Sequence, residues 1–387
     1  MTPAARIAAA IGVLDQVLDG TAAEPALLRW SRASRFAGSG DRAAVRDLVF
    51  TALRRRDSLA AAGGALTGRG LMIGLLRTEG RDPGALFTGA GHAPGPLTDA
   101  ERVAPTPLPG HEAATDIPGW LWPAWQRALG PDAMAIARAM TRRAPVWLRV
   151  NIARTTPAKL ADLLADEGIA TAPSPLLDHA LCITEGERRL SASRPYADGL
   201  VELQDLSAQL ACAALPLPPE ARVLDYCAGG GGKVLALAAR APRARFLAHD
   251  ADPARMRDLS ARAERAGARI AISADPGGQF DLVVADVPCS GSGTWRRTPD
   301  AKWRLTPSRL DDLRRMQAQI LDRVAPLVAR GGHLAYMTCS LLDAENRDQI
   351  AAFQARHPGF AAPSIAEWTP LTASDGFFLA VLRHDKD

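Results

Sequence analysis

The chain of 387 residues contains few lysines, although it is rich in basic residues. Of its 46 basic residues only four are lysine, and arginine fills the other basic positions. The four are Lys159, Lys233, Lys302 and Lys386. Because a compact ammonium and a planar guanidinium are not interchangeable, a retained lysine marks a position where its own chemistry matters.

Cysteines are also few, and long apolar runs are missing. The five cysteines are scattered and odd in number, with no C-x-x-C pair, which excludes a disulfide framework and a zinc site. No uncharged apolar run approaches the roughly 18 residues of a membrane span. Asp15 and Asp19 interrupt the N-terminal apolar stretch, which favours an amphipathic helix over a signal peptide. We therefore expect a reduced, cytoplasmic protein with no membrane association and no metal.

Composition and charge indicate a globular protein with a mild bias towards acidic partners. Hydrophobic residues make up 47% of the chain and charged residues 23%, as in ordinary globular proteins. The net charge of +4 is compatible with nucleic-acid binding, and is weak support by itself. The length suffices for two or three domains.

The second half of the chain alternates buried strand patterns with helical ones. Short apolar runs typical of buried strands occur at Arg222–Asp225, Arg245–Asp250, Leu282–Ala285 and His333–Met337. Apolar runs separated by helices predict a parallel, doubly wound α/β sheet. The front of the chain predicts helices instead, the first capped by Thr2 and ending at Gly20.

A glycine run follows the first of these strands and predicts a ligand site. Gly229 to Gly232 lead from the strand ending at Asp225 into a helix that contains Lys233. Glycines allow a tight turn and a close approach to a ligand at a helix N-terminus. Asp250 ends the next strand, where an acidic side chain can bind ribose hydroxyls. Val234 at the third glycine position disfavours a dinucleotide, and the run lacks the pattern of a nucleotide triphosphatase.

Two cysteines follow two other strands of the predicted sheet. Cys289 lies in the segment Asp286–Gly293, and Cys339 lies in the segment Tyr336–Ser340. Both thus occupy the carboxyl ends of strands, where open α/β sheets bind ligands. Cys182 and Cys212 are interpreted as small core residues instead.

Together these motifs resemble the Sun-type (RsmB-like) family of RNA cytosine-C5 methyltransferases. The family's cofactor loop C-A-A-P-G-G-K corresponds to Cys227–Lys233, with Gly230 in place of the usual proline. Its D-A-P-C-S-G segment corresponds to Asp286–Gly291, and its T-C-S segment with the trailing E-N to Thr338–Asn346. Asp375–Phe378 resembles the family's C-terminal hairpin.

The resemblance implies a fold and a set of domains. The catalytic part would be a Rossmann-like class I methyltransferase domain over residues 204–387. A small α+β intermediate domain would occupy residues 116–203. An all-helical, NusB-like RNA-binding domain would occupy residues 1–115, on the likeness of Arg35–Gly38 and Asp41-Arg42 to that domain.

The resemblance also implies a cofactor and site residues. Cys339 would be the nucleophile, and Cys289 would help in proton removal and enzyme release. The cofactor would be S-adenosyl-L-methionine. The residues expected to contact it, or in part the target base, are Cys227, Ala228, Gly229, Gly230, Gly231, Gly232, Lys233, Asp250, Asp275 and Asp286.

Cytosine chemistry suits this cysteine pair. Cytosine C5 is a poor nucleophile, and a thiolate adding to C6 makes C5 reactive towards an electrophilic methyl group. A base must then remove the C5 proton before the thiolate can leave, and an acid such as Asp286 would stabilise the adduct.

The sequence therefore predicts an RNA cytosine-C5 methyltransferase that acts on 16S ribosomal RNA as a monomer. The alternatives are a transfer-RNA methyltransferase, a catalytically silent RNA-binding ribosome assembly factor, and a DNA cytosine-C5 methyltransferase with Cys289 as nucleophile. Two further basic segments are expected near RNA. Arg54–Arg56 could contact phosphates or cap a helix, and Trp295–Arg304 could stack on bases and contact phosphates.

Overall fold

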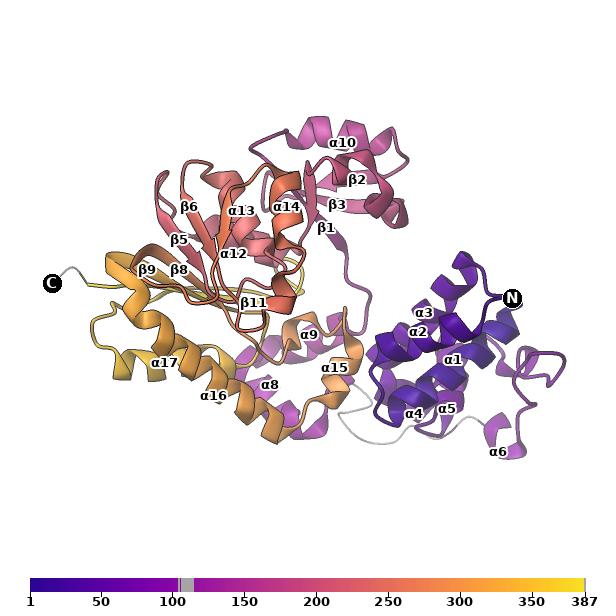
Figure 1. Cartoon of the computed structure of the whole chain (residues 1–387). Coiled ribbons are helices and arrows are strands. Elements are labelled where there is room, and N and C mark those ends of the chain that lie inside the picture. The colour runs from indigo at the N-terminus through magenta and orange to yellow at the C-terminus, as the bar shows by residue number, and fades with distance from the viewer. Residues whose placement is uncertain (104, 106–114, 386–387) are drawn as a thin grey trace. The chain divides into compact units, whose positions relative to one another are not determined.

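The computed structural model describes residues 1–103, 105 and 115–385. Their contacts divide the chain into two compact units (Figure 1). The helical unit comprises Met1–Arg143 together with Trp295–Pro307, and the sheet unit comprises Ala144–Thr294 together with Ser308–Asp387. The expected domain boundaries at 115/116 and 203/204, and the NusB-like assignment, stay predictions.

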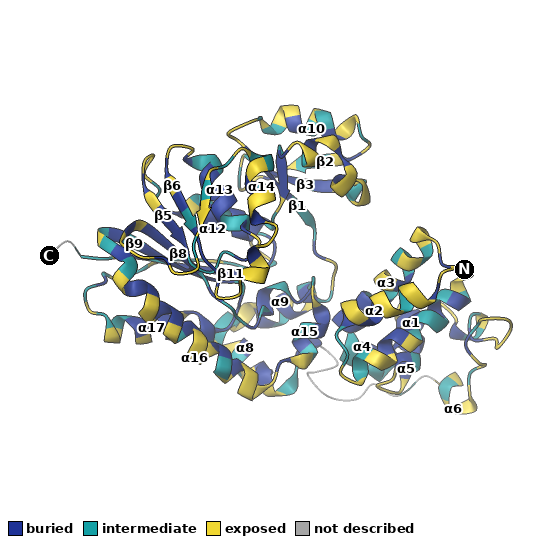
Figure 2. Ribbon diagram, in the orientation of Figure 1, coloured by how far each residue is buried: buried dark blue, intermediate teal, exposed yellow. Residues whose placement is uncertain are grey.

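Five helices form the core of the helical unit. Thr2 caps the first, as the sequence predicted, by accepting a hydrogen bond from the Ala5 amide at 3.2 Å. Gly63 lets the last two helices pack closely, because a Cβ there would lie 1.8 Å from the Gly70 carbonyl oxygen. The helices are α1 (Pro3–Leu18), α2 (Ala23–Ala33), α3 (Ser39–Arg54), α4 (Arg56–Gly63) and α5 (Gly68–Thr78). Their apolar faces form one buried cluster (Figure 2).

Shorter elements complete the helical unit. These are η1 (Pro83–Ala85), α6 (Asp99–Arg102), η2 (Gly119–Leu121), α8 (Trp122–Leu129), η3 (Gly130–Asp132), α9 (Ala133–Met140) and α15 (Pro299–Arg304). Within the described residues no single helix is long and apolar enough to cross a membrane. Only α4 and α5 taken together, with an angle of 87° between them, have the length and apolar composition of a span.

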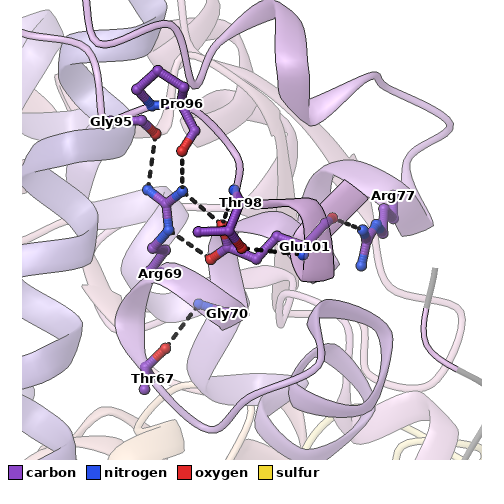
Figure 3. A network of polar contacts seen from close by, with 8 residues as sticks. All are labelled: Thr67, Arg69, Gly70, Arg77, Gly95, Pro96, Thr98 and Glu101. Atoms are coloured by element: carbon purple, nitrogen blue, oxygen red, sulfur yellow. Dashed lines mark hydrogen bonds and ion pairs between the residues drawn. The ribbon is translucent and has the colours of Figure 1, made fainter. Parts of the chain in front are cut away.

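A polar network fastens α5 to the segment that follows it (Figure 3). The Arg69 guanidinium binds the Glu101 carboxylate through two nitrogens, at 2.7 and 2.9 Å, and donates to the carbonyl oxygens of Gly95 and Pro96. Arg77 donates to the Glu101 carbonyl. The hydrogen bond from Arg69, with those from Thr98, lowers the pKa of Glu101 to about 2. Glu101 therefore stays ionised and holds this segment against α5.

The segment Trp295–Pro307 packs within the helical unit although it follows the Cys289 loop in sequence. The Trp295 ring stacks on Trp125, with ring centroids 6.0 Å apart. The indole nitrogen of Trp303 donates to the Leu53 carbonyl at 2.6 Å. The Lys302 ammonium donates to the Arg54 carbonyl at 3.2 Å. This segment is thus part of the helical core.

The sheet unit begins with a small antiparallel sheet of four strands in the order β2-β3-β1-β4. The strands are β1 (Val146–Val150), β2 (Ala170–Pro173), β3 (Ala180–Glu185) and β4 (Val201–Leu203). Its helices are α10 (Pro157–Ala165), η4 (Glu187–Ala192) and α11 (Arg194–Ala197). Leu160 and Leu164 of α10 pack against the strands in one core cluster.

A second sheet of seven strands has the order β10-β11-β9-β8-β5-β6-β7. The strands from β5 to β9 run parallel, and β11 pairs antiparallel with β9 and β10. The strands are β5 (Arg222–Asp225), β6 (Arg245–Ala248), β7 (Ile270–Ile272), β8 (Phe280–Asp286), β9 (Val328–Thr338), β10 (Ser364–Trp368) and β11 (Phe377–Arg383). This confirms the predicted parallel, doubly wound sheet.

Helices cover both faces of this sheet (Figure 1). One buried cluster joins the strands to α12, α13 and α14, and another joins them to α16 and α17. The helices are α12 (Leu206–Ala214), α13 (Gly232–Arg240), α14 (Leu259–Ala266), α16 (Pro307–Val324) and α17 (Arg347–Arg356). Short turns are η5 (Pro253–Met256), η6 (Ser292–Thr294), η7 (Ala325–Leu327) and η8 (Asp343–Glu345). The strand order reverses direction between β5 and β8, which places a ligand crevice at their carboxyl ends.

Candidate active site

The glycine run forms the turn between β5 and α13. Gly229 and Gly231 have φ values of +51° and +83°, a region that only glycine occupies without strain. The Gly229 amide donates to Asp250 Oδ2 at 2.9 Å, and the Asp252 amide donates to Asp250 Oδ1 at 3.0 Å. Arg255 forms an ion pair with the same Oδ2 at 3.1 Å. The structure thus brings the predicted loop and Asp250 together.

Basic side chains donate hydrogen bonds to the carbonyl groups of this loop. Arg149 donates to the Gly232 carbonyl at 2.5 Å, and Arg262 donates to the Gly230 carbonyl. The buried carboxylate of Glu202 pairs with Arg262 at 2.7 Å and with Arg265 at 2.5 Å. Glu202 and Arg262 were not predicted from the sequence, since nothing local marks them.

Lys233 and Asp286 form an ion pair across the crevice. The Lys233 ammonium binds Asp286 Oδ2 and lies 5.3 Å from the centre of the Phe377 ring. Burial opposes the charge on Lys233, but attraction by Asp286 outweighs it, so the pKa of Lys233 lies above its usual value. Both residues were predicted as part of the site, and the structure brings them together.

Asp225 is a candidate that the sequence showed only as the end of a strand. It is 1% exposed, and burial raises its pKa to about 7 against the lowering effects of Lys233 and the Val234 amide. Within the described residues neither carboxylate oxygen has a hydrogen bond of good geometry. A buried acceptor beside the glycine turn suits the ammonium group of an amino-acid ligand.

The remaining predicted cofactor residues follow strands at the same edge of the sheet. Asp275 follows β7, is exposed, and its amide donates to the Ser273 hydroxyl at 3.2 Å. β7 pairs with β6, whose carboxyl end leads to Asp250, so Asp275 lies one strand farther along the same edge. Cys227 and Ala228 begin the turn, and burial raises the pKa of the Cys227 thiol. Cys227 therefore lines the turn as a protonated thiol.

The two predicted catalytic cysteines meet at the carboxyl ends of β8 and β9. Their sulfur atoms lie 3.4 Å apart. The Val287 amide donates to the Met337 carbonyl at 3.1 Å, and the Gly293 amide donates to the Cys339 carbonyl at 2.9 Å. Backbone hydrogen bonds on either side of Cys289 thus tie its loop to the chain around Cys339.

The surroundings of Cys289 favour its protonated form. The hydrogen bond to Cys339, then burial, then the charges of Cys339 and Glu345 raise the pKa of Cys289 well above its usual value. Burial alone raises the pKa of Cys182, and it raises that of Cys212 to about 11 despite Lys233 and Arg149. Among the described cysteines, the pair differs in having a second sulfur at contact distance.

Family models and relatives match this arrangement. A model described as 16S rRNA methyltransferase RsmB/F matches residues 212–383, and one described as the RsmF/B-like, ferredoxin-like domain matches residues 117–188. The ribosomal RNA small subunit methyltransferase B of Salmonella typhi is 36% identical over 283 residues. That alignment covers 68% of this chain and 66%, just under two thirds, of the relative.

The chain belongs to the RsmB/F methyltransferase family. Solved structures share this fold. The crystal structure of PH0851 has a TM-score of 0.79 at 21% identity and covers 99% of both chains. The crystal structure of NSun6 from Pyrococcus horikoshii with SFG has a TM-score of 0.62 at 18% identity and covers 70% of this chain and 99% of that one.

The cofactor of this methyltransferase family is S-adenosylmethionine, as the sequence predicted. The site fits that molecule, because Asp225 offers a buried acceptor for its ammonium and Asp250 one for its ribose. The glycine turn follows Asp225 and hydrogen-bonds to Asp250, and its lack of side chains permits the close approach of a ligand.

Two residues of the expected base-stacking segment after Cys289 are buried. Trp295 and Lys302 are each 1% exposed and contribute to the helical core, so the expectation that they stack on bases and contact phosphates is wrong for both. Of the arginine triplet, Arg54 is buried and donates to the Arg296 carbonyl, and Arg56 lies over the Trp303 ring. Sequence proximity to Cys289 suggested RNA contact, but long-range packing uses these side chains.

Proposed function

We propose that this chain is an S-adenosylmethionine-dependent RNA cytosine-C5 methyltransferase that acts on 16S ribosomal RNA. The contact between the Cys289 and Cys339 sulfurs, 3.4 Å apart beside the cofactor crevice, carries this proposal. Methyl transfer to a nitrogen or to a hydroxyl needs no thiol, whereas activation of cytosine C5 needs a nucleophile that adds to C6. The names of the relatives support ribosomal RNA as substrate.

In the first half of the reaction, the Cys339 thiolate adds to C6 of the cytosine. The new carbon–sulfur bond moves an electron pair into the ring, so that C5 becomes nucleophilic. Bound S-adenosylmethionine supplies the electrophilic methyl group that C5 accepts. The Cys289 thiol donates towards the Cys339 sulfur before addition, which keeps the attacking thiolate in position.

In the second half, a base removes the C5 proton, the C5–C6 double bond re-forms and the bond to Cys339 breaks. We assign this base to Cys289. Its proton is retained chiefly by the hydrogen bond to Cys339. Once Cys339 is bonded to carbon that interaction weakens, so Cys289 can release its proton to solvent and accept the one from C5.

Bisulfite sequencing of total RNA from cells with and without the gene tests the proposal. We expect one cytosine of 16S ribosomal RNA to be protected only when the gene is present. The purified chain should methylate the corresponding RNA in vitro. A protected cytosine in transfer RNA would reassign the substrate, and no protected cytosine together with an inactive purified chain would favour the silent assembly factor.

A further inference from the structure

One buried carboxylate lies behind both catalytic cysteines. Glu345, at the end of η8, is completely buried, and it is not needed for any chemical step above. Its position six residues after Cys339 is set by the tight turn that leaves β9. A buried carboxylate is costly unless hydrogen bonds satisfy it, so its partners indicate its role.

The Glu345 carboxylate accepts hydrogen bonds from both cysteine loops. Oε1 accepts from the Ser290 amide at 2.8 Å and from the Gln317 side chain at 3.0 Å. Oε2 accepts from the Ser290 and Ser340 hydroxyls, each at 2.5 Å. Ser290 directly follows Cys289, and Ser340 directly follows Cys339. One side chain therefore spans the two loops at the residues next to the sulfurs.

Among the described residues, every hydrogen-bond partner of this carboxylate is a donor, and a deprotonated carboxylate only accepts. Within the described part of the chain no cation forms an ion pair with Glu345. Its charge is therefore balanced by hydrogen bonds alone. A neutral amide in its place would turn an NH₂ group towards at least one donor and leave that contact unsatisfied.

The surrounding bonds fix Glu345 itself. The Tyr336 hydroxyl donates to the Glu345 carbonyl at 2.6 Å, and the Thr338 hydroxyl donates to the side chain of the next residue, Asn346, at 2.6 Å. Because Tyr336 and Thr338 belong to β9, the carboxylate is held rigidly relative to the strand that carries Cys339.

We propose that Glu345 is a positioning residue for the methyl transfer, which holds the Cys289 and Cys339 loops together from behind and keeps their sulfurs at contact distance. This inference rests on the proposed function. The charge of Glu345 adds a second effect, since it also raises the pKa of Cys289. Glu345 thus helps to keep the proton on Cys289 until Cys339 has reacted.

The test compares Glu345→Gln with the wild-type protein and with Glu367→Gln. Glu367 is an exposed carboxylate on β10 that pairs with Arg347, so its variant controls for loss of one carboxylate in the same unit. With RNA, we expect Glu345→Gln to lower kcat by about 100-fold, as for small misplacements of reacting groups, with KM little changed. Glu367→Gln should behave as wild type.

A second experiment, chemical labelling of the thiols, needs no RNA. Iodoacetamide labelling of Cys289 and Cys339 is followed by peptide mass spectrometry as a function of pH. The titratable groups that act on Cys289 are Cys339, Glu345 and Tyr336. Without the Glu345 charge, Cys289 should be alkylated at lower pH than in wild type. Because loss of packing would also lower the pKa values of Cys182 and Cys212, which burial raises, unchanged alkylation of these two thiols separates the effect of the Glu345 charge from unfolding.

If Glu345→Gln does not fold, Ser340→Ala removes one of the four hydrogen bonds and is measured in the same way. Wild-type kcat and an unchanged alkylation profile in the variant that folds would overturn the inference. If the wild-type chain methylates no cytosine, the proposed function fails, and the labelling arm still decides whether Glu345 sets the state of the thiol pair.

Discussion

The Arg262 guanidinium donates a hydrogen bond to the Gly230 carbonyl, at the loop position where the family usually has proline. A Cβ atom at Gly230 would lie 2.9 Å from this guanidinium, so the small residue makes room for Arg262. Glu202 fixes Arg262 in turn through an ion pair. A side-chain hydrogen bond thus restrains a loop that lacks the proline ring usual in the family.

We expect Arg262→Gln to weaken S-adenosylmethionine binding by about 1–2 kcal/mol, because a freed loop must be ordered again on binding. Arg265→Gln is the matched control, since Arg265 also pairs with Glu202 but, within the described residues, forms no hydrogen bond with the loop. Titration calorimetry on both variants makes the comparison. Equal affinities would show that the restraint does not matter for the cofactor.

The second prediction concerns Asp250. Asp250→Ala removes the predicted ribose acceptor and the partner of the Gly229 amide, so cofactor affinity should fall by about 1–3 kcal/mol. Asp252→Ala, two residues later and exposed, should bind as wild type does. Calorimetry that finds the same affinity for the two variants would remove Asp250 from the site.

The third prediction separates the cysteines. Cys339→Ala should abolish both methylation and the covalent protein–RNA adduct. Cys289→Ala should still form the adduct but release it slowly, because its base is missing. A slower band on denaturing gels, sensitive to RNase, measures the adduct. The reverse pattern would make Cys289 the nucleophile, as in the DNA-type mechanism.

The fourth prediction concerns RNA contacts on the helical unit. Arg32, Arg35 and Arg42 are exposed and form no ion pair with any residue that the structure describes. In single-stranded RNA each phosphate contact contributes roughly 0.7 to the slope of log K for binding against log salt concentration. Replacing all three arginines by glutamine should therefore reduce that slope by up to about two. The same change at Arg222, Arg243 and Arg330, near the amino ends of the strands, is the control. Identical slopes in both variants would exclude a specific phosphate surface.

The fifth prediction concerns pH and the Arg69–Glu101 pair. The pKa of Glu101 is lowered to about 2 from 4.5, so its stabilising contribution is present above pH 4.5 and is lost as pH falls towards 2. Glu101→Gln should therefore destabilise α5 by about 1 kcal/mol at pH 6, a value reduced by partial exposure, and by less near pH 2. Hydrogen exchange of the α5 amides measures this, with exposed Glu79→Gln as control. A pH-independent difference would contradict the linkage.

Local patterns were sufficient to predict on which strand ends the candidate residues lie, but not which side chains support them. The first and last residues of β5 were predicted correctly, because an apolar run followed by glycines is a local signal. The ends of β8 and β9 likewise placed both cysteines on one edge of the sheet. Arg262 carries no such signal, since its partners lie on other elements. Glu345 was recognised only as part of the E-N motif, and nothing in the sequence indicated its contacts with both cysteine loops. Trp295 was misinterpreted for the same reason, because its partner Trp125 is far away in sequence.

The path of the chain has a consequence for biosynthesis. The ribosome delivers Met1–Arg143 first, yet the helical unit also contains Trp295–Pro307. Trp125 therefore lacks its stacking partner, and Leu53 its bond to Trp303, until most of the sheet unit has been translated. The part of the molecule that emerges first is thus completed by residues that emerge after both the glycine turn and Cys289.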